Sequence, residues 1–550
     1  MIQTTKNQTQ MDQNSPNRKS KKLVMDGTEK TKKTWWKKDA PSMPGRTRSC
    51  NVIKFTQGPK GPALNANSPE ELWGVFITPD IIRVLVEHTN SMIAVRRDKY
   101  AQSCRTHDTD DVEMKALIGL LMLAGTYHTS RLNLEDMWKN DGTGIEVFRM
   151  TMSLNRFRFL LCCLRFDDKA TREERKKVDK LAPIRHIFEM FVENCKKNYT
   201  PSEYVTIDAM VVAFRGKAPF RQYIPSKPAK YGIKIHSMCD AKTFYVCNME
   251  IYAGLQPEGP YKADKGYNSA YAVVKRLTSP ISGSARNVTF DNWYTSYPLV
   301  DSLVRDHNLT AVGTLRKNKR EIPKEFLDIK KRPTCDSLFG FGDQLTLVSY
   351  IPRKKSTKKN VVLISSMHRD KKIDEATGED KKPEIITFYN STKGGVDVVD
   401  MMMDKYSVSR NSRRWPLTVF FALLNISCVN SYVLYVHNPQ NTLKRRKFIK
   451  QASFVLLQDT LKRRCQNMRL PKSLREGISK TLPETAVATP SASSQPSQTK
   501  AKRCEFCPRS KDRKVKSTCS TCKKNVCSDH SKMCVTCTEC ENADNGCESE

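Results

Sequence analysis

The spacing of apolar and polar residues divides the chain into a helical region and a strand-forming region. From about residue 70 to 200, apolar residues recur at three- and four-residue spacing, as in DVEMKALIGLLMLAGTYH. This spacing predicts amphipathic helices. From about residue 203 the pattern changes to β-branched and aromatic runs separated by polar turns, which are YVTIDAMVVAF, YGIKIHSMCD and TFYVCNMEIYAG. Such runs predict strands.

The next segments predict that these strands belong to a mixed α/β sheet. A helical pattern, NSAYAVVKRL, precedes a strand, NVTFD, a helix, YPLVDSLVRDH, and a strand, LTAVGTL. The order of three strands, helix, strand, helix and strand is typical of a sheet with helices packed on it. Residues 319–380 are expected to be an insertion that contains one hairpin.

Long helices are expected in the region that follows. The most apolar run of the chain begins there at Trp415, and it is interrupted by Asn425, Ser427 and Asn430. Because of these polar residues we interpret the run as a buried helix and expect no membrane partner. A Ser-, Thr- and Pro-rich stretch over 479–502 predicts a linker to a cysteine-rich tail.

The charge of the chain indicates its class of partner. Lys and Arg number 94 against 58 Asp and Glu, a formal net charge of +36. Such a field favours nucleic acid, because each neutralised phosphate releases counterions; the alternative is a basic protein without such a partner. The amino end has no apolar signal core, and 19 cysteines then indicate a reducing compartment. Within the basic first 65 residues, KTKKTWWKK fits a nuclear import signal, a phosphate-contacting patch or a solvated tail.

Four acidic residues stand where a shared metal site is favoured. Asp208 lies inside the first strand and Asp291 at the end of the fourth. If these two strands are neighbours, the two carboxylates lie side by side. Asp397 and Asp400 are one helical turn apart and share a helix face, so a helix packed at the same edge adds both of them.

Several carboxylates in one place repel one another and become favourable around divalent cations. Mg²⁺, or Mn²⁺ in its place, takes oxygen ligands and pairs them with substrate phosphates. Two such ions roughly 3.5–4 Å apart promote in-line displacement at phosphorus, the chemistry of DNA cleavage and strand transfer. Structural explanations also exist: Asp397 suits a first helical turn, and Asp291 suits a helix cap. Asp208 is the hardest to explain structurally, because an unpaired charge in an apolar strand is costly.

The carboxyl-terminal tail contains four pairs of metal-ligand residues. In each pair two residues separate the ligands, which are Cys504/Cys507, Cys519/Cys522, Cys527/His530 and Cys534/Cys537. Eight such ligands suffice for two tetrahedral Zn²⁺ ions, and metal binding would supply the folding energy of so short a segment. Basic residues between the first two pairs are candidates for contacts to DNA phosphates, with a solvated loop as the alternative: Lys511, Arg513, Lys514 and Lys516.

From about residue 70 to 540 the chain resembles the piggyBac family of transposases. TIDAMVVAFRGKAPFRQYIPSKPAKYGIKI, DNWYTS and YNSTKGGVDVVDMM are similar to the family's segments around its first, second and third catalytic aspartates. The resemblance therefore implies that Asp208, Asp291 and Asp397 form the catalytic triad of an RNase H-like domain, with Asp400 as a fourth metal-site acid. Trp415 matches a tryptophan near the family's active site, with core packing as its alternative role.

The resemblance also implies an activity. Members of the family cut and paste double-stranded DNA between transposon inverted repeats and TTAA targets, through hairpin ends. The implied protein is a nuclear homodimer, with a cross-braced zinc finger in which the first and third ligand pairs share one ion. Two departures are Ala209, where relatives often carry Glu, and an amino arm that is basic where theirs is acidic. Alternatives are a domesticated, non-catalytic DNA-binding protein and a zinc-domain ubiquitin ligase or histone reader.

The expected fold is a multidomain α+β protein. An RNase H-like mixed α/β catalytic domain with an insertion is flanked by helical dimerisation and DNA-binding segments and followed by a cross-braced zinc finger. The predicted segments are a disordered basic arm (1–65), a first helical segment (66–202), a first catalytic segment (203–318), the insertion (319–380), a second catalytic segment (381–406), a second helical segment (407–478), the linker (479–502) and the zinc finger (503–540).

Overall fold

The computed structural model describes most of the chain. The described residues are 22–24, 35–42, 52–53, 55–100, 106–225, 227–256, 266, 268–353, 358–482, 502–511, 514–515, 517 and 524–531. The chain forms two compact units, Met1–Leu482 and Pro483–Glu550. Each unit is described by itself.

Helices dominate the chain before the sheet, as the spacing of apolar residues predicts. They are α1 (Pro69–Gly74), α2 (Pro79–Arg97), α3 (Asp111–Thr126), α4 (Leu134–Trp138), α5 (Glu146–Thr151), α6 (Leu154–Cys163), α7 (Arg172–Val178) and α8 (Arg185–Asn198). Ser68, Asp110 and Ser153 cap α1, α3 and α6 by accepting hydrogen bonds from first-turn N–H groups.

The first unit is built around one mixed sheet of 11 strands. The strands are β1 (Lys22–Val24), β2 (Trp35–Lys37), β5 (Tyr204–Ala213), β6 (Gln222–Tyr223), β7 (Tyr231–Asp240), β8 (Val246–Ile251), β9 (Asn287–Phe290), β10 (Thr310–Thr314), β11 (Ser337–Phe341), β12 (Thr346–Tyr350) and β13 (Val361–Ser365). Their order is β1-β2-β11-β12-β13-β10-β9-β5-β7-β6, with β8 paired to β7. A separate pair joins β3 (Gly58–Pro59) to β4 (Tyr199–Thr200).

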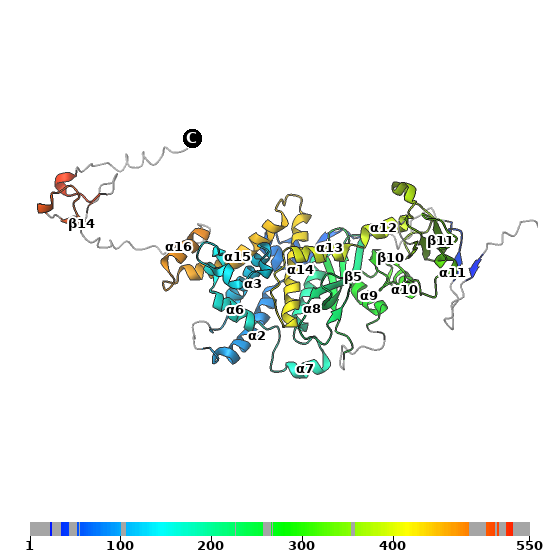
Figure 1. Ribbon diagram of the computed structural model, residues 1–550, viewed down its shortest axis with the longest axis horizontal. Helices are drawn as coiled ribbons and strands as arrows, with labels where there is room; N and C mark the ends of the chain where they lie inside the picture. Colours follow the sequence, from blue (N-terminus) through cyan, green and yellow to red (C-terminus); the bar gives the residue numbers. More distant parts are fainter. Residues whose placement is uncertain are drawn as a thin grey trace, which may run out of the picture. The chain divides into compact units, whose positions relative to one another are not determined.

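The predicted order of strands and helices is confirmed in the centre of this sheet. After β5, β7 and β8 come α9 (Ala270–Thr278), β9, α10 (Tyr297–His307) and β10 (Figure 1). Strand β9 pairs in parallel with both β5 and β10, so the first and fourth predicted strands are neighbours. The two-residue strand β6 was not expected; it pairs with β7 and makes a short hairpin.

The region 319–380 extends the same sheet. Strands β12 and β13 pair antiparallel, as the predicted hairpin requires, and β13 continues onto β10. The short helix α11 (Lys324–Leu327) precedes them. Strand β2 adds to the edge at β11, and the Trp36 side chain is only 1% exposed. The prediction of disorder for 1–65 is therefore wrong at Trp36, because its indole finds an apolar site against this edge.

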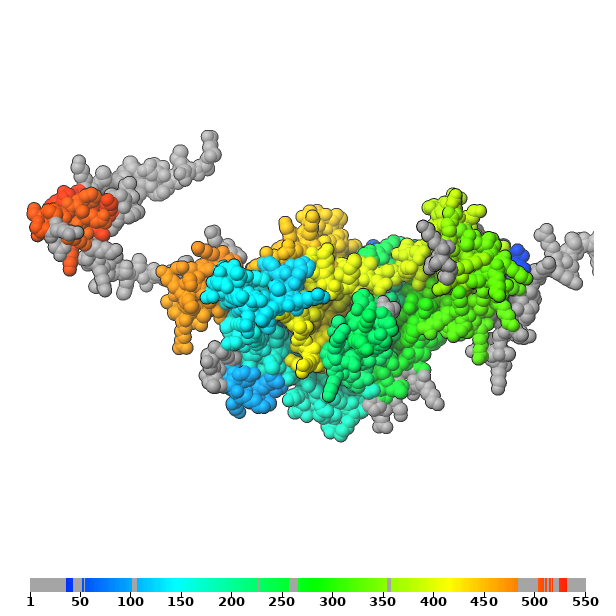
Figure 2. All heavy atoms as spheres, viewed as in Figure 1, coloured from blue at the N-terminus to red at the C-terminus, as the bar shows by residue number. Residues whose placement is uncertain are grey.

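Helices after the sheet join it to the first helical segment. They are α12 (Glu384–Thr392), α13 (Gly395–Lys405), α14 (Trp415–His437), α15 (Arg445–Cys465) and α16 (Lys472–Thr481). Helix α15 lies along α3 so closely that a Cβ added at Gly119 would lie 2.8 Å from Leu457 Cδ2. On the face drawn in Figure 2, residues of α13 and α14 (yellow) lie between the first helices (cyan) and the sheet (green).

Helix α14 is the buried helix that the sequence predicts. It is long and apolar enough to cross a membrane by length and composition, yet 94% of its most apolar window is buried inside the protein. Its two buried asparagines have internal partners: Asn430 donates to Val246 O and accepts from Val246 N, and Asn425 accepts from Val408 N. These hydrogen bonds explain how polar side chains are accommodated in this core.

In the second unit, the described residues include a short hairpin of β14 (Lys502–Arg503) and β15 (Lys514–Val515). A 3₁₀ turn, Ser528–His530, follows. The predicted linker 479–502 lies largely outside the described residues.

Candidate active site and metal centre

The parallel register of β5 and β9 places Asp208 beside Asp291. Ile207 pairs with Phe290, so the residues that follow them, Asp208 and Asp291, are level at this point of the sheet. Two residues earlier, Thr206 pairs with Thr289. Because side chains alternate along a strand, each aspartate points to the same face as the threonine before it. The neighbouring-strand prediction for these two acids is confirmed.

Both threonines face the end of α12 and the start of α13. Thr206 Oγ1 donates to Thr392 O at 2.5 Å, and Thr289 Oγ1 lies 2.8 Å from Thr392 Oγ1. At the first residue of α13, a Cβ added to Gly395 would meet Thr206 Oγ1 at 2.6 Å. Only glycine lets this helix start so close to β5. Gly395 therefore serves this close packing, whereas a Cβ added at Gly394 would meet nothing within 4 Å.

Lys227 connects the acids of the sheet with those of the helix. This residue lies on the short connection between β6 and β7, and its Nζ donates to Asp397 Oδ1 at 2.8 Å. The same Nζ lies 3.5 Å from Asp208 Oδ2. One ammonium thus contacts carboxylates from distant segments of the chain only because β5 and α13 pack together. The sequence reasoning missed Lys227.

The electrostatics of the site show that the carboxylates crowd one another. Burial raises the pKa of Asp208; the Lys227 ammonium opposes this, and Asp291 and Asp397 raise it further. Burial raises the pKa of Asp400 to about 7, and Asp397 and Asp208 act in the same direction against Lys227. Asp208 therefore senses the charges of Asp291 and Asp397, and Asp400 senses those of Asp397 and Asp208. A cation that replaced the protons would favour the charged carboxylates.

The donors are of the chemical kind that a hard divalent cation prefers, although their oxygens do not form a group within 4.8 Å of one another. They are carboxylate oxygens from two strands and one helix, and a positive group, the Lys227 ammonium, already lies among them. Oxygen donors of this kind are those that Mg²⁺ and Mn²⁺ prefer. Asp291 has a second role, since its Oδ1 accepts hydrogen bonds from Trp293 N and Tyr294 N. That turn orients the carboxylate and leaves its other oxygen available to a cation.

A second lysine, Lys234, and the rings of Trp293, Tyr294 and His236 contact one another next to Asp291 in the chain and on β7. Lys234 Nζ is 4.0 Å from the centroid of the Trp293 ring, and His236 stacks on the same indole. The Nδ1 of His236 is 2.6 Å from Tyr294 Oη. Burial lowers the pKa of His236 to about 3, so this imidazole is neutral and packs in the core. These residues support the turn that carries Asp291.

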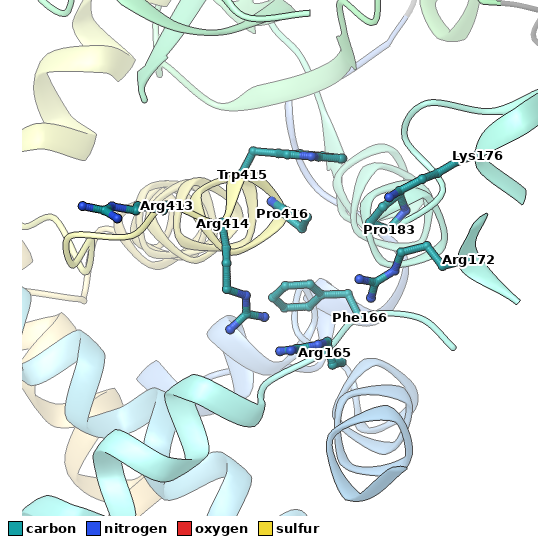
Figure 3. Close-up of a pocket in the computed structure, with 9 residues that line it drawn as sticks. All are labelled: Arg165, Phe166, Arg172, Lys176, Pro183, Arg413, Arg414, Trp415 and Pro416. Carbon is teal, nitrogen blue, oxygen red and sulfur yellow. The ribbon is translucent and has the colours of Figure 1, made fainter. Parts of the chain in front are cut away.

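A basic pocket lies at the start of α14. Its cavity of about 230 Å³ is lined by Arg165, Phe166, Arg172, Lys176, Pro183, Arg413, Arg414, Trp415 and Pro416 (Figure 3). Arg414 reaches toward Arg165 and Phe166, and it donates to the carbonyls of Leu161 and Leu164.

The pocket carries uncompensated positive charge. Burial and the neighbouring Arg165 lower the pKa of Arg414 to about 10. Within the described residues, no carboxylate forms an ion pair with Arg165, Arg413 or Arg414. Trp415 is half-buried and packs edge-on against Phe220, at 5.0 Å between ring centroids. The site therefore suits an anionic group beside an aromatic ring. Core packing explains the contact of Trp415 with Phe220, but not the arginines that line the pocket beside it.

The second unit contains a metal-ligand cluster. One ligand atom from each of Cys504, Cys507, Cys527 and His530 lies within 4.8 Å of the other three. Cys507 Sγ is 3.7 Å from both Cys527 Sγ and His530 Nδ1, and Cys527 Sγ is 3.2 Å from His530 Nδ1. Thiolates about 2.3 Å from a tetrahedral Zn²⁺ would lie about 3.8 Å apart. The cluster is compatible with a zinc finger and joins the first and third predicted pairs.

The other predicted residues of the tail are only partly described. Lys511 and Lys514 are exposed near the β14–β15 hairpin. The second set of predicted ligands and two of the basic residues fall outside the described residues: Cys519, Cys522, Cys534, Cys537, Arg513 and Lys516.

Comparisons with known proteins agree with this architecture. The profile of the family described as Transposase IS4 matches residues 68–432. Human PiggyBac transposable element-derived protein 3 is 26% identical over 399 residues, which are 69% of this chain and 64% of the relative. The human Chimeric ERCC6-PGBD3 protein is 26% identical over 399 residues, 69% of this chain and 36% of the relative. A cryo-EM structure of a piggyBac transposase synaptic complex with hairpin DNA matches with a TM-score of 0.74 and 36% identity, over 86% of this chain and 98% of that chain.

A transposase profile over most of the first unit, together with the facing aspartates of its sheet, defines the class as a DDE-type transposase. The solved structure extends the match to 86% of the chain. The chain belongs to the piggyBac family of transposases.

Proposed function

We propose that this protein is an active cut-and-paste DNA transposase, which cleaves phosphodiester bonds at transposon ends and joins them to target DNA. The observation that carries the proposal is the position of Asp208 beside Asp291 on neighbouring strands, with Lys227 paired to both Asp208 and the helix acid Asp397. Acids serving only as helix caps or first-turn residues have no reason to meet in this way.

Asp208, Asp291, Asp397 and Asp400 would hold two divalent cations, Mg²⁺ or Mn²⁺. When bound, such ions supply the activation of a water or 3′-hydroxyl and the neutralisation of charge on the scissile phosphate. The protein's own contribution is orientation. The β5–β9 register fixes two of the acids, and the contact between Gly395 and Thr206 sets the helix that carries the others.

The basic pocket would bind DNA next to this catalytic centre. Arg165, Arg413 and Arg414 offer charge to phosphates, and the half-buried ring of Trp415 offers a stacking surface. The formal charge of +36 supports a polyanionic partner. TTAA targeting, hairpin intermediates, inverted-repeat recognition, an RNase H-like catalytic domain and action as a homodimer follow from family membership. The matched cryo-EM structure, a synaptic complex with hairpin DNA, supports the same proposal.

The second unit would fold around two Zn²⁺ ions and contact the transposon end. The converging set of Cys504, Cys507, Cys527 and His530 supports the first ion. The second would use Cys519, Cys522, Cys534 and Cys537. Lys511, Arg513, Lys514 and Lys516 would then meet DNA phosphates. A nuclear location fits the DNA substrate and the basic arm.

An excision assay tests the proposed activity. The full-length protein is incubated with DNA carrying the source element's own ends and Mg²⁺. We expect wild type to release the element and Asp208→Ala to be inactive, at least about a thousandfold below wild type. Asp404→Ala is the matched control, because Asp404 is an exposed acid one turn beyond Asp400. Equal cutting by wild type and Asp208→Ala would refute the proposal.

A domesticated, non-catalytic DNA-binding protein is the second candidate. The observation that favours it is the name of one human relative, PiggyBac transposable element-derived protein 3. In the same assay this candidate predicts specific binding of the ends without nicking in either Mg²⁺ or Mn²⁺.

A further inference from the structure

Lys227 contacts two carboxylates that come from different elements of the catalytic site. Its Nζ is 2.8 Å from Asp397 Oδ1 and 3.5 Å from Asp208 Oδ2. The shorter contact is a charge-assisted hydrogen bond, and the longer one is an ion pair. The Lys227 side chain is 18% exposed, whereas that of Asp397 is 63% exposed. The lysine is thus the more enclosed partner and lies under the helix acid.

Backbone hydrogen bonds fix the conformation of the β6–β7 connection that carries Lys227. Ile224 N donates to Lys230 O at 2.7 Å, and Lys227 N donates to Ile224 O at 3.1 Å. These bonds close the connection between β6 and β7 on itself. In the sheet, β7 lies between β6 and β5, and from this connection the Lys227 side chain reaches Asp208 of β5.

Lys234 provides an informative contrast. It lies on β7, and its ammonium is directed to the ring of Trp293, 4.0 Å from the ring centroid. Burial lowers the pKa of Lys234, and the charges of Asp291 and Asp208 oppose this effect. Among the described residues, however, only Lys227 forms ion pairs with acids of this site. The two lysines have different partners in the same sheet.

We propose that Lys227 is the built-in counter-ion of the metal-free site, and that a divalent cation binds in competition with it. This inference rests on the proposed function, because it requires the four acids to be the cation site. An ammonium and a divalent cation repel each other and use the same carboxylate oxygens. Lysine suits the exchange, since its compact charge moves on a flexible stem without a change of backbone.

The displaced ammonium needs a new anion, and a DNA phosphate is the one that the substrate brings. Binding of DNA therefore removes the competitor, and cation and DNA bind cooperatively. Without DNA, Lys227 compensates part of the negative charge of Asp208 and Asp397, and the site takes up the cation more weakly. The lysine in this way couples occupation of the metal site to the presence of substrate.

Equilibrium binding of Mn²⁺ to the zinc-loaded, full-length protein tests the inference, with free Mn²⁺ measured by electron paramagnetic resonance. Lys227→Met, or Lys227→Gln if the first variant unfolds, should bind Mn²⁺ about five- to tenfold more tightly than wild type without DNA. Lys227→Arg keeps the charge and should bind as wild type does. The control is Lys242→Met, which removes an ion pair to Glu203 outside the site and should change nothing. Adding transposon-end DNA should tighten wild-type binding more than that of Lys227→Met.

Wild-type or weaker Mn²⁺ affinity in both uncharged variants would overturn the competition. The double variant Asp208→Asn/Asp397→Asn separates this failure from failure of the proposed function. If wild type binds Mn²⁺ and the double variant does not, the cation site stands and only the role of Lys227 is refuted. If wild type and the double variant bind the same amount of Mn²⁺, these carboxylates do not form a cation site. The proposed cation site is then refuted, and the inference about Lys227 is refuted with it.

Discussion

Thr206 of β5 lies opposite Thr289 of β9, and the hydroxyl groups of both contact Thr392 at the end of α12. This contact joins two strands to the helix pair α12–α13, two residues before each strand presents its aspartate. The relative position of the sheet acids and the helix acids therefore depends on buried, neutral hydrogen bonds that lie outside the acidic cluster.

The first prediction concerns this junction. Thr206→Val keeps the shape of the side chain but leaves Thr392 O without its donor. The free energy of unfolding should fall by about 1–2 kcal/mol. Mn²⁺ affinity should also fall, because α13, which carries Asp397 and Asp400, loses a contact that fixes its position against β5. Urea unfolding and Mn²⁺ titration measure the two effects. Thr143→Val, at an exposed loop position, is the control. Unchanged Mn²⁺ affinity in a destabilised Thr206→Val protein would show that the junction does not position the acids.

The second prediction is a pH dependence that arises from Asp400. Burial raises the pKa of this carboxyl from its ordinary 3.8 to about 7. A group with a raised pKa in the folded state binds its proton more tightly there than in the unfolded chain. Its stabilising contribution is therefore complete below about pH 4 and is lost as the pH rises toward 7. In magnesium-free buffer, wild type should lose more stability between pH 5 and 8 than Asp400→Asn, whereas Asp98→Asn, at an exposed acid outside the site, should behave as wild type. Identical losses in wild type and Asp400→Asn would contradict the assignment.

The same shift should govern cation binding. Protons and divalent cations compete for the carboxylates, so Mn²⁺ affinity should weaken as the pH falls below about 7. Calorimetric titration at pH 6 and 8 measures this directly. A Mn²⁺ affinity that does not change across this range would mean that Asp400 does not belong to the site.

The third prediction concerns zinc content. Full-length protein should carry two Zn²⁺ per chain, and Cys527→Ser should lose about one of them. Mass spectrometry of the bound metal gives the number, and limited proteolysis should release the second unit faster in the variant. Cys162→Ser changes an exposed cysteine outside the cluster and should keep both ions. Full zinc retention in Cys527→Ser would contradict the assigned ligand set.

The fourth prediction concerns the basic pocket. Arg413 is exposed and lines the cavity beside Trp415. Arg413→Ala should weaken DNA binding about equally for all sequences and reduce the slope of log affinity against log salt by about 1. Arg353→Ala removes an exposed arginine that pairs with Glu379 and serves as the control. An unchanged salt slope in Arg413→Ala would place the DNA elsewhere.

Part of the candidate site could be predicted because it depends on chain order and strand alternation. An aspartate inside an apolar strand is costly, so Asp208 stood out from its neighbours in the sequence alone. Because Asp291 stands at the end of a later strand, the sequence predicted that this strand and the strand of Asp208 are neighbours. The parallel pairing of β5 with β9 confirmed this prediction. The spacing of Cys504, Cys507, Cys527 and His530 likewise indicated metal ligands before any geometry was known.

Other features could not be predicted because they depend on contacts between distant segments. Lys227 is one of many lysines in a basic chain, and only the folded β6–β7 connection gives it two acidic partners. The basic pocket draws residues from the region after α6 and from the start of α14, which helix packing brings together. The local pattern assigns Trp36 to a polar arm, because a single strand that pairs with a distant edge leaves no periodicity of its own.

The most direct measurement is anomalous diffraction from crystals of the DNA-bound protein soaked in Mn²⁺. We expect manganese peaks within coordinating distance of the carboxylates of Asp208, Asp291 and Asp397, with the Lys227 ammonium moved away from Asp397. Manganese absent from these carboxylates, or found only at scattered surface acids, would contradict a shared cation site.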